Sequence, residues 1–284
     1  MDESHIESFV DETTFKKILH YLSSEKALNV NAFKESYLKR RIYFRAIALR
    51  LPNINAYWQY LITNEAEVEK FKDLLTVNVT SFFRNPEVFD TLKRYVIPEL
   101  LEQKQKNKEK FIKILSIGCA SGEEPYSVAI MLKENFDQEI KIIKPYILGI
   151  DFDSQSINHA RLGVYEIQKV ANLSDSLKKK YFGIIDNRHC QLSLDIRSMV
   201  IFRQDDIFMR DLKKFWDIIF CRNVLIYIKP QSQDVLLTKI IYACREGGYL
   251  VLGKSEGLVG KLRSFFSPKY PKERIYVKRR VYES

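Results

Sequence analysis

A glycine turn at residues 118–122 is the first feature of this sequence that can hold a ligand. Residues 112–117 predict a buried strand, the turn reads Gly-Cys-Ala-Ser-Gly, and residues 125–135 predict a helix. Glycine lets the backbone turn tightly and approach a ligand at the carboxyl end of a strand. The spacing is neither that of a GxGxxG dinucleotide site nor that of a P-loop, because no Gly-Lys-Ser/Thr follows.

Acidic residues next to this turn narrow the class of ligand. Glu123 and Glu124 begin the helix, where a pyrophosphate would meet carboxylates in place of free N–H groups. Asp151 follows a predicted strand, 33 residues after Gly118, and can accept hydrogen bonds from both ribose hydroxyls. Separately, each feature is also typical of a plain turn or a helix cap. Together they indicate a nucleoside ligand without phosphates and with a cationic part, and S-adenosyl-L-methionine is such a ligand.

The distribution of glycine predicts two kinds of structure. All ten glycines lie at or after Gly118, and a long stretch without glycine favours helices. Helices are predicted at 7–23, 31–50, 56–62, 65–74, 86–101, 125–135, 155–162 and 231–243, and strands at 112–117, 146–150, 215–221 and 249–253. Strands that alternate with helices predict an α/β fold with a doubly wound, mostly parallel sheet. Residues 163–201 break the alternation and are interpreted as an inserted β-subdomain. The expected domains are a helical domain at 1–75, a linker and connecting helix at 76–110, and the ligand-binding domain at 111–284.

Five segments of the chain resemble the CheR family of chemotaxis-receptor methyltransferases. They are LLTVNVTSFFRNPEVF at 74–89, GCASGEEPYSVAI at 118–130, GIDFDSQSINHARLGVY at 149–165, FWDIIFCRNVLIYI at 215–228 and GGYLVLGKSEGL at 247–258. The resemblance implies a Rossmann-like class I methyltransferase fold with a small N-terminal all-helical domain. It implies transfer of a methyl group from S-adenosyl-L-methionine, with S-adenosyl-L-homocysteine as product, to glutamate side chains of receptors.

The resemblance and the glycine turn together give ten expected cofactor-binding positions. Glu123 corresponds to an acid near the methionine end of the cofactor, and Asp151 to the acid that binds the ribose. This chain has Asp206 where the family usually has asparagine beside the adenine. The full set is Asn78, Thr80, Arg84, Gly118, Glu123, Asp151, Asp206, Ile207, Arg222 and Asn223.

Two residues are expected to act on the reacting groups. A glutamate side chain has a pKa of roughly 4.3, so it is ionised at neutral pH and needs no strong general base to attack a methyl group. Positioning is then the main task of the protein. We expect Arg84 to steer the substrate carboxylate and Tyr227, which matches a family tyrosine near the transferred methyl group, to hold it in line. The alternative for Tyr227 is a core aromatic residue.

Basic charge favours an acidic partner. The chain carries 46 basic and 36 acidic residues, a net charge of +10, and Lys34, Arg41 and Arg45 lie close to one face of a predicted helix. Electrostatic docking of these three on the cytoplasmic domain of methyl-accepting chemotaxis receptors is the expected role. The alternative is an ordinary solvated face.

Several other classes of protein are disfavoured. The four cysteines form no CxxC pair, the histidines show no metal-ligand spacing, and the N-terminus lacks the pattern of a signal peptide. We expect a cytoplasmic monomer without metal, nucleic acid or membrane insertion. A nucleic-acid methyltransferase stays an alternative, although CysArgAsnVal at 221–224 stands where Asp-Pro-Pro-Tyr is expected. The other alternative, a non-catalytic cofactor-binding adaptor, is disfavoured by the acids and Asn223.

Overall fold

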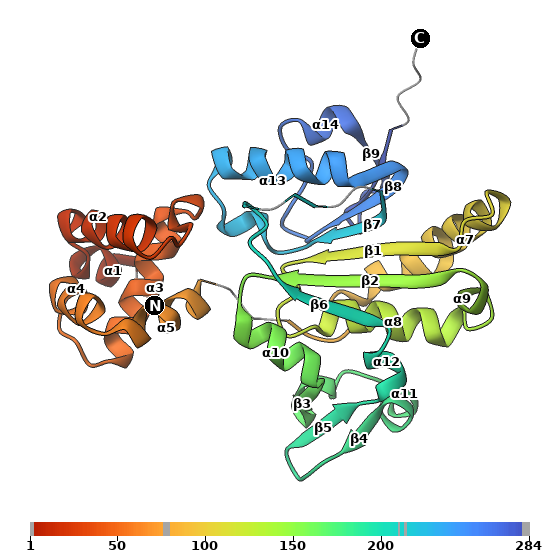
Figure 1. Cartoon of the computed structure of the whole chain (residues 1–284), viewed down its shortest axis with the longest axis horizontal. Helices are drawn as coiled ribbons and strands as arrows, with labels where there is room; N and C mark the ends of the chain where they lie inside the picture. Colours follow the sequence, from red (N-terminus) through yellow and green to blue (C-terminus); the bar gives the residue numbers. More distant parts are fainter. Residues whose placement is uncertain (1–2, 76–79, 210, 213–214, 280–284) are drawn as a thin grey trace. The chain divides into compact units, whose positions relative to one another are not determined.

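The chain divides into two compact units (Figure 1). The computed structural model describes residues 3–75, 80–209, 211–212 and 215–279. One unit consists of Met1–Val77 with Tyr227–Gln233, and the other of Asn78–Ile226 with Asp234–Ser284.

The first unit is helical. Its helices are α1 (Glu3–Phe9), α2 (Glu12–His20), the π-helix η1 (Tyr21–Glu25), the 3-10 helix η2 (Val30–Ala32), α3 (Glu35–Ala48), α4 (Ile54–Thr63) and α5 (Glu65–Leu74). The helix predicted at 7–23 was wrong in one respect, because Asp11 accepts the N–H groups of Thr13 and Thr14 and so starts a new helix. The helix predicted from residue 31 begins at Glu35, after a short 3-10 turn.

The second unit is built around a seven-stranded sheet with the order β6-β2-β1-β7-β8-β10-β9. Its strands are β1 (Phe111–Ile117), β2 (Lys144–Asp151), β6 (Val200–Gln204), β7 (Trp216–Cys221), β8 (Cys244–Leu252), β9 (Phe266–Tyr270) and β10 (Ile275–Lys278). The first five pair in parallel, and β10 pairs antiparallel with β8 and β9. This confirms the doubly wound, mostly parallel sheet.

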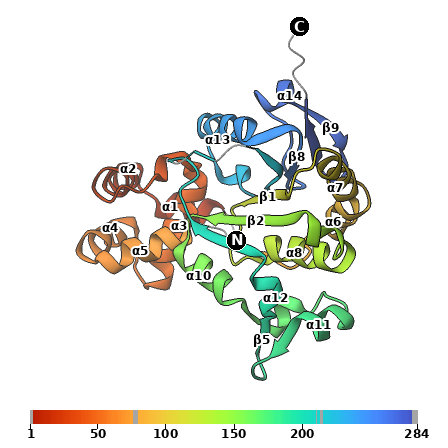
Figure 2. The same ribbon diagram turned by 45° about the vertical axis from the view of Figure 1, so that its right-hand side comes forward.

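Helices cover both faces of this sheet. They are α6 (Pro86–Thr91), the π-helix η3 (Leu92–Val96), α7 (Ile97–Lys106), α8 (Glu123–Asn135), α9 (Glu139–Ile142), α10 (Ser154–Leu162), α13 (Pro230–Ala243) and α14 (Leu262–Phe265), with the 3-10 turn η5 (Leu225–Tyr227). Figures 1 and 2 show α8 and α10 on one side of β1 and β2 and α13 on the other. All six residues of β7 are buried, as expected for a central strand covered on both faces.

A small antiparallel sheet lies between α10 and β6 in the sequence. It has the strand order β3-β5-β4, with β3 (Val164–Glu166), β4 (Phe182–Ile184) and β5 (His189–Leu192). The helices of this insertion are η4 (Ile167–Val170), α11 (Asp175–Tyr181) and α12 (Leu194–Arg197). An inserted β-subdomain was expected here, but β6 begins at Val200, so residues 200–201 belong to the main sheet.

Asn85 is the residue before α6, but its side chain does not cap that helix. Its backbone is left-handed (φ 63°) and its side chain makes no capping hydrogen bond to α6. Its Oδ1 atom instead accepts a hydrogen bond of 2.7 Å from Nη2 of Arg222. The helical path from Pro86 continues through η3 to Lys106, which is farther than the predicted end at residue 101. Within the described ranges, no helix is long and apolar enough to cross a membrane.

Candidate active site

The glycine turn joins the carboxyl end of β1 to α8, as its spacing predicts. Gly118 and Gly122 both have positive φ angles, 68° and 91°, which favour glycine. A Cβ atom on Gly118 would lie 2.7 Å from a methyl group of Val224. The N–H groups of Gly118 and Cys119 donate to the carbonyl of Ile150 at 2.9 and 3.1 Å, so the turn is fixed to the end of β2.

Asp151 ends β2 beside this turn. Its side chain is buried, with the residue 5% exposed, and accepts N–H groups from Ala120 at 2.8 Å and Asp153 at 3.0 Å. Burial raises the pKa of the Asp151 carboxyl, and these two backbone hydrogen bonds oppose the rise. The backbone of Phe152 also acts as a hydrogen-bond donor that opposes the rise, so of about four acceptor positions on a carboxylate Asp151 keeps capacity for a ribose hydroxyl.

Glu123 begins α8 and is fully buried, with 0% exposed. Its Oε2 atom accepts a hydrogen bond of 2.7 Å from Ser121 Oγ. Its Oε1 atom is buried without a hydrogen-bond partner among the described residues. Burial raises the pKa of the Glu123 carboxyl. A buried carboxylate oxygen with no partner is costly, and a cationic ligand would remove this cost. The site therefore fits S-adenosyl-L-methionine, which carries two cationic groups.

The neighbouring acid, Glu124, has a different role. Its Oε1 atom accepts from Ser116 Oγ at 2.8 Å, and its Oε2 atom pairs with Nη1 of Arg222 at 3.0 Å. Arg222 also donates through Nη2 to the carbonyl of Arg84 at 2.8 Å. Arg222 thus fixes α8 to the segment that precedes α6.

The segment 80–85 is held at several backbone atoms by side chains of other elements. The carbonyl of Phe82 accepts from Asn172 Nδ2 at 2.8 Å, and the N–H of Phe83 donates to Ser127 Oγ at 2.8 Å. The carbonyl of Thr80 accepts from Lys169 Nζ at 3.3 Å. These contacts fix the backbone that carries Thr80 and Arg84. Asn78 lies outside the described residues.

The residues after β6 and β7 also lie at this edge of the sheet. The N–H of Asp205 donates to the carbonyl of Asp151 at 2.9 Å, which places Asp206 and Ile207 directly after a residue bonded to the end of β2. The Oδ1 atom of Asp206 accepts the N–H of Phe208 at 2.8 Å. Asn223 follows Arg222 after β7, with a left-handed backbone (φ 59°).

Tyr227 belongs to the helical unit. Its ring lies 4.9 Å from the ring of Tyr37, and its carbonyl accepts the N–H of Lys34 at 3.0 Å. The guanidinium of Arg41 lies 4.9 Å from the Tyr37 ring centroid, a cation–π distance. Lys34, Tyr37, Arg41 and Tyr227 therefore form one continuous set of contacts. The reactive role of Tyr227 stays a prediction.

Arg45 has a structural partner. Its Nε atom donates to Glu67 Oε1 at 2.7 Å, and its Nη2 atom pairs with Oε2 of the same side chain at 2.5 Å. Glu67 is 1% exposed and also accepts from the hydroxyl of Tyr57. Reversing the charge of Arg45 would leave Glu67 buried without its cation, so a test of receptor docking has to use Lys34 and Arg41.

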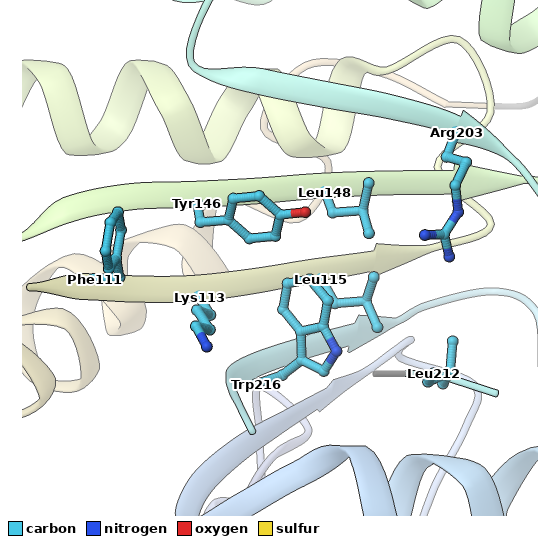
Figure 3. Close-up of a pocket in the computed structure, with 8 residues that line it drawn as sticks. All are labelled: Phe111, Lys113, Leu115, Tyr146, Leu148, Arg203, Leu212 and Trp216. Carbon is cyan, nitrogen blue, oxygen red and sulfur yellow. The ribbon is translucent and has the colours of Figure 1, made fainter. Parts of the chain in front are cut away.

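A cavity of about 370 Å³ lies on the sheet away from these residues (Figure 3). Its lining is mostly apolar and includes the stacked rings of Tyr146 and Trp216, whose centroids are 5.7 Å apart. Among the described residues that line it, none is a predicted cofactor residue. The acids that fit the cofactor are instead at the carboxyl ends of β1 and β2.

Glu256 is the residue at this edge that sequence reasoning did not single out. It lies in GKSEG, after β8, and its carboxylate accepts backbone N–H groups of the loop after β7. The signal that could have found it is an acid a few residues beyond a buried strand, at the edge where ligands of parallel sheets bind.

The sheet order, the glycine turn and the two buried acids are those expected of an S-adenosylmethionine-dependent methyltransferase. Comparison with protein families agrees with this class. Residues 78–272 match the model of the CheR methyltransferase, SAM binding domain, and residues 13–76 match the CheR methyltransferase, all-alpha domain. The chain belongs to the CheR methyltransferase family, and the resemblance seen in its motifs is confirmed.

Curated relatives match over most of their length. A chemotaxis protein methyltransferase of Borreliella burgdorferi is 28% identical over 256 residues, which cover 88% of this chain and 90% of the relative. One from Listeria innocua is 30% identical over 233 residues, with 82% and 85% covered. Chemotaxis protein methyltransferase Cher2 of Pseudomonas putida is 34% identical over 197 residues, with 68% and 70% covered.

Proposed function

We propose that this protein transfers a methyl group from S-adenosyl-L-methionine to glutamate side chains of chemotaxis receptors. The observation that carries the proposal is the match to both domains of the family. A separate match to the Borreliella chemotaxis protein methyltransferase covers 90% of that relative. The product would be a glutamate methyl ester, which removes one negative charge from the receptor.

The cofactor supplies a methyl group on a sulfonium centre, and the residues of this chain bind and orient the reactants. Asp151 is the acceptor for a ribose hydroxyl. The Oε1 atom of Glu123, which has no hydrogen-bond partner among the described residues, pairs with a cationic group of the cofactor. Arg84, whose backbone is fixed by Arg222, would direct a substrate carboxylate by charge.

No strong base is required in this reaction. The substrate glutamate has an ordinary pKa of roughly 4.3 and is already ionised. Its negative charge disappears when the ester forms, so a site that excludes water favours the reaction. Tyr227 would hold the carboxylate in line through its hydroxyl.

A transfer assay with methyl-labelled cofactor tests the proposal. Purified protein is incubated with membranes that carry chemotaxis receptors, and the labelled receptor is then treated with mild base. Label released as methanol identifies a carboxyl methyl ester and supports the proposal. Label that resists base identifies another acceptor atom. No label, from protein that still binds S-adenosyl-L-homocysteine, indicates a non-catalytic adaptor, and either result rejects the proposal.

A further inference from the structure

Glu256 is a buried carboxylate with an unusual set of partners. It follows β8 and is 6% exposed. Its Oε1 atom accepts the N–H groups of Val224 at 3.0 Å and Leu225 at 2.8 Å. Its Oε2 atom accepts the N–H groups of Asn223 and Gly253, both at 2.8 Å. One side chain therefore satisfies four backbone donors from two separate loops.

The two loops pack so closely around Glu256 that there is no space for a side chain at Gly253. A Cβ atom on Gly253 would lie 2.6 Å from Glu256 Oε2 and 2.9 Å from the backbone nitrogen of Asn223. Asn223 has a left-handed backbone, which costs energy in a residue other than glycine and needs support from its surroundings. The carboxylate of Glu256 provides this support, because it accepts hydrogen bonds from three consecutive residues of the loop.

The loop that Glu256 shapes leads directly to the segment before α6. Arg222 precedes Asn223, and its guanidinium donates to the carbonyl of Arg84 and to Oδ1 of Asn85. The same guanidinium pairs with Glu124 of α8. A shift of the Asn223 backbone would move Arg222 and, with it, the segment that contains Arg84.

We propose that Glu256 is a positioning residue of the active site. It fixes the loop after β7, and through Arg222 it fixes the backbone of Arg84 beside the glycine turn. This inference rests on the proposed function only in taking the edge around Glu123 and Asp151 as the cofactor site. Nothing in it depends on which molecule accepts the methyl group.

Replacement of Glu256 by glutamine tests the inference with almost no change in shape. An amide has one acceptor oxygen, and its NH2 group would face two of the four N–H groups as a donor. We expect the affinity for S-adenosyl-L-homocysteine, measured by calorimetry, to fall roughly tenfold or more, since small displacements in a binding site have large effects. We also expect kcat to fall with little change in KM for the methyl acceptor.

A matched control separates positioning from general loss of stability. Asp217 is a fully buried carboxylate in the same sheet, near the beginning of β7, and accepts the N–H of Lys113 at 2.7 Å. Asp217→Asn should lower the melting temperature at least as much as Glu256→Gln and leave the cofactor affinity of folded protein within about twofold. If Glu256→Gln does not fold, Gly253→Ala displaces the same carboxylate and should give the same loss of affinity.

Two results would overturn the inference. One is wild-type affinity for S-adenosyl-L-homocysteine in folded Glu256→Gln or Gly253→Ala. The other is an equal loss of affinity in Asp217→Asn at an equal loss of melting temperature. If the wild-type protein binds S-adenosyl-L-homocysteine but does not methylate receptors, only the proposed function fails, because the binding measurement still tests Glu256.

Discussion

Two buried glutamates at the carboxyl edge of the sheet differ in how many hydrogen bonds their carboxylate oxygens accept. Glu256 has both oxygens occupied by four backbone N–H groups. Glu123 has one oxygen bonded to Ser121 and the other without a partner in the described structure. The difference indicates that a saturated carboxylate organises the backbone, whereas an unsaturated one is kept for a ligand.

The largest effect is expected from removal of the saturated carboxylate. Glu256→Ala leaves four N–H groups of two loops without an acceptor, and each unsatisfied buried group costs about 1–3 kcal/mol. Because water enters part of the space, we expect a total loss of about 4 kcal/mol in the free energy of unfolding. Urea unfolding at neutral pH measures this. A loss below about 1 kcal/mol would mean that Glu256 does not organise these loops.

Removal of the ribose acceptor should act on binding. Asp151→Ala removes charge-assisted hydrogen bonds to the ligand. We expect their loss to cost about 1.5–3 kcal/mol of binding free energy. Calorimetric titration with S-adenosyl-L-homocysteine should show a loss of affinity in this range. Unchanged affinity in a folded variant would remove Asp151 from the site.

Glu123, whose Oε1 atom has no hydrogen-bond partner among the described residues, is expected to lower the stability of the ligand-free protein and to strengthen cofactor binding. Glu123→Gln removes an unpaired buried charge, so the free energy of unfolding of the ligand-free protein should rise by about 1 kcal/mol. Affinity for S-adenosyl-L-methionine should fall by roughly tenfold, because a cationic group loses its carboxylate. Unfolding and binding are measured on the same preparation. A variant that is less stable than wild type would contradict the reading of Glu123 as an unsatisfied acid.

The same variant has a pH signature. Burial raises the pKa of Glu123 above its ordinary value, so the folded state favours the protonated form. The stability associated with this proton is present below the ordinary pKa and is lost as pH rises through the raised pKa. The advantage of Glu123→Gln over wild type should therefore be largest above neutral pH and shrink as the solution is acidified. A difference that does not depend on pH would exclude this origin.

The smallest effect is expected from two basic residues of the helical unit, Lys34 before α3 and Arg41 within it. Lys34→Glu with Arg41→Glu should raise KM for the receptor by roughly threefold at low salt, where screening is weakest. Affinity for S-adenosyl-L-homocysteine should stay unchanged. Lys70→Glu, an exposed position on α5, is the matched control. An equal rise of KM in the control, or none in the double variant, would make α3 an ordinary solvated face.

The sequence predicted the glycine turn and its acids well because their geometry is local. Gly118, Glu123 and Asp151 each stand directly at a strand or helix end, so their place in the fold follows from their place in the chain. Alternation of helices with apolar strands predicted the sheet for the same reason. The strand β6 was missed because only its first three residues, 200–202, are apolar, and it ends on the polar residues Arg203 and Gln204.

The contacts that fix the site could not be predicted in this way. Glu256 is separated by 33 residues from Asn223, and Arg222 by 137 residues from Asn85. Nothing in the local pattern of Asn85-Pro86 distinguishes a helix cap from a partner for a distant arginine. Arg45 could not be predicted for the same reason. Its position on a helix is equally compatible with an exposed basic face and with a bond to Glu67.

Tandem mass spectrometry of a modified receptor tests the central claim most directly. The cytoplasmic domain of a chemotaxis receptor is incubated with the protein and S-adenosyl-L-methionine, and its peptides are sequenced before and after mild base. The proposed function predicts one added methylene on glutamate side chains, reduced with Asp151→Ala at limiting cofactor concentration and lost on treatment with base. A methylene on any other atom, or none with protein that binds S-adenosyl-L-homocysteine, would contradict it.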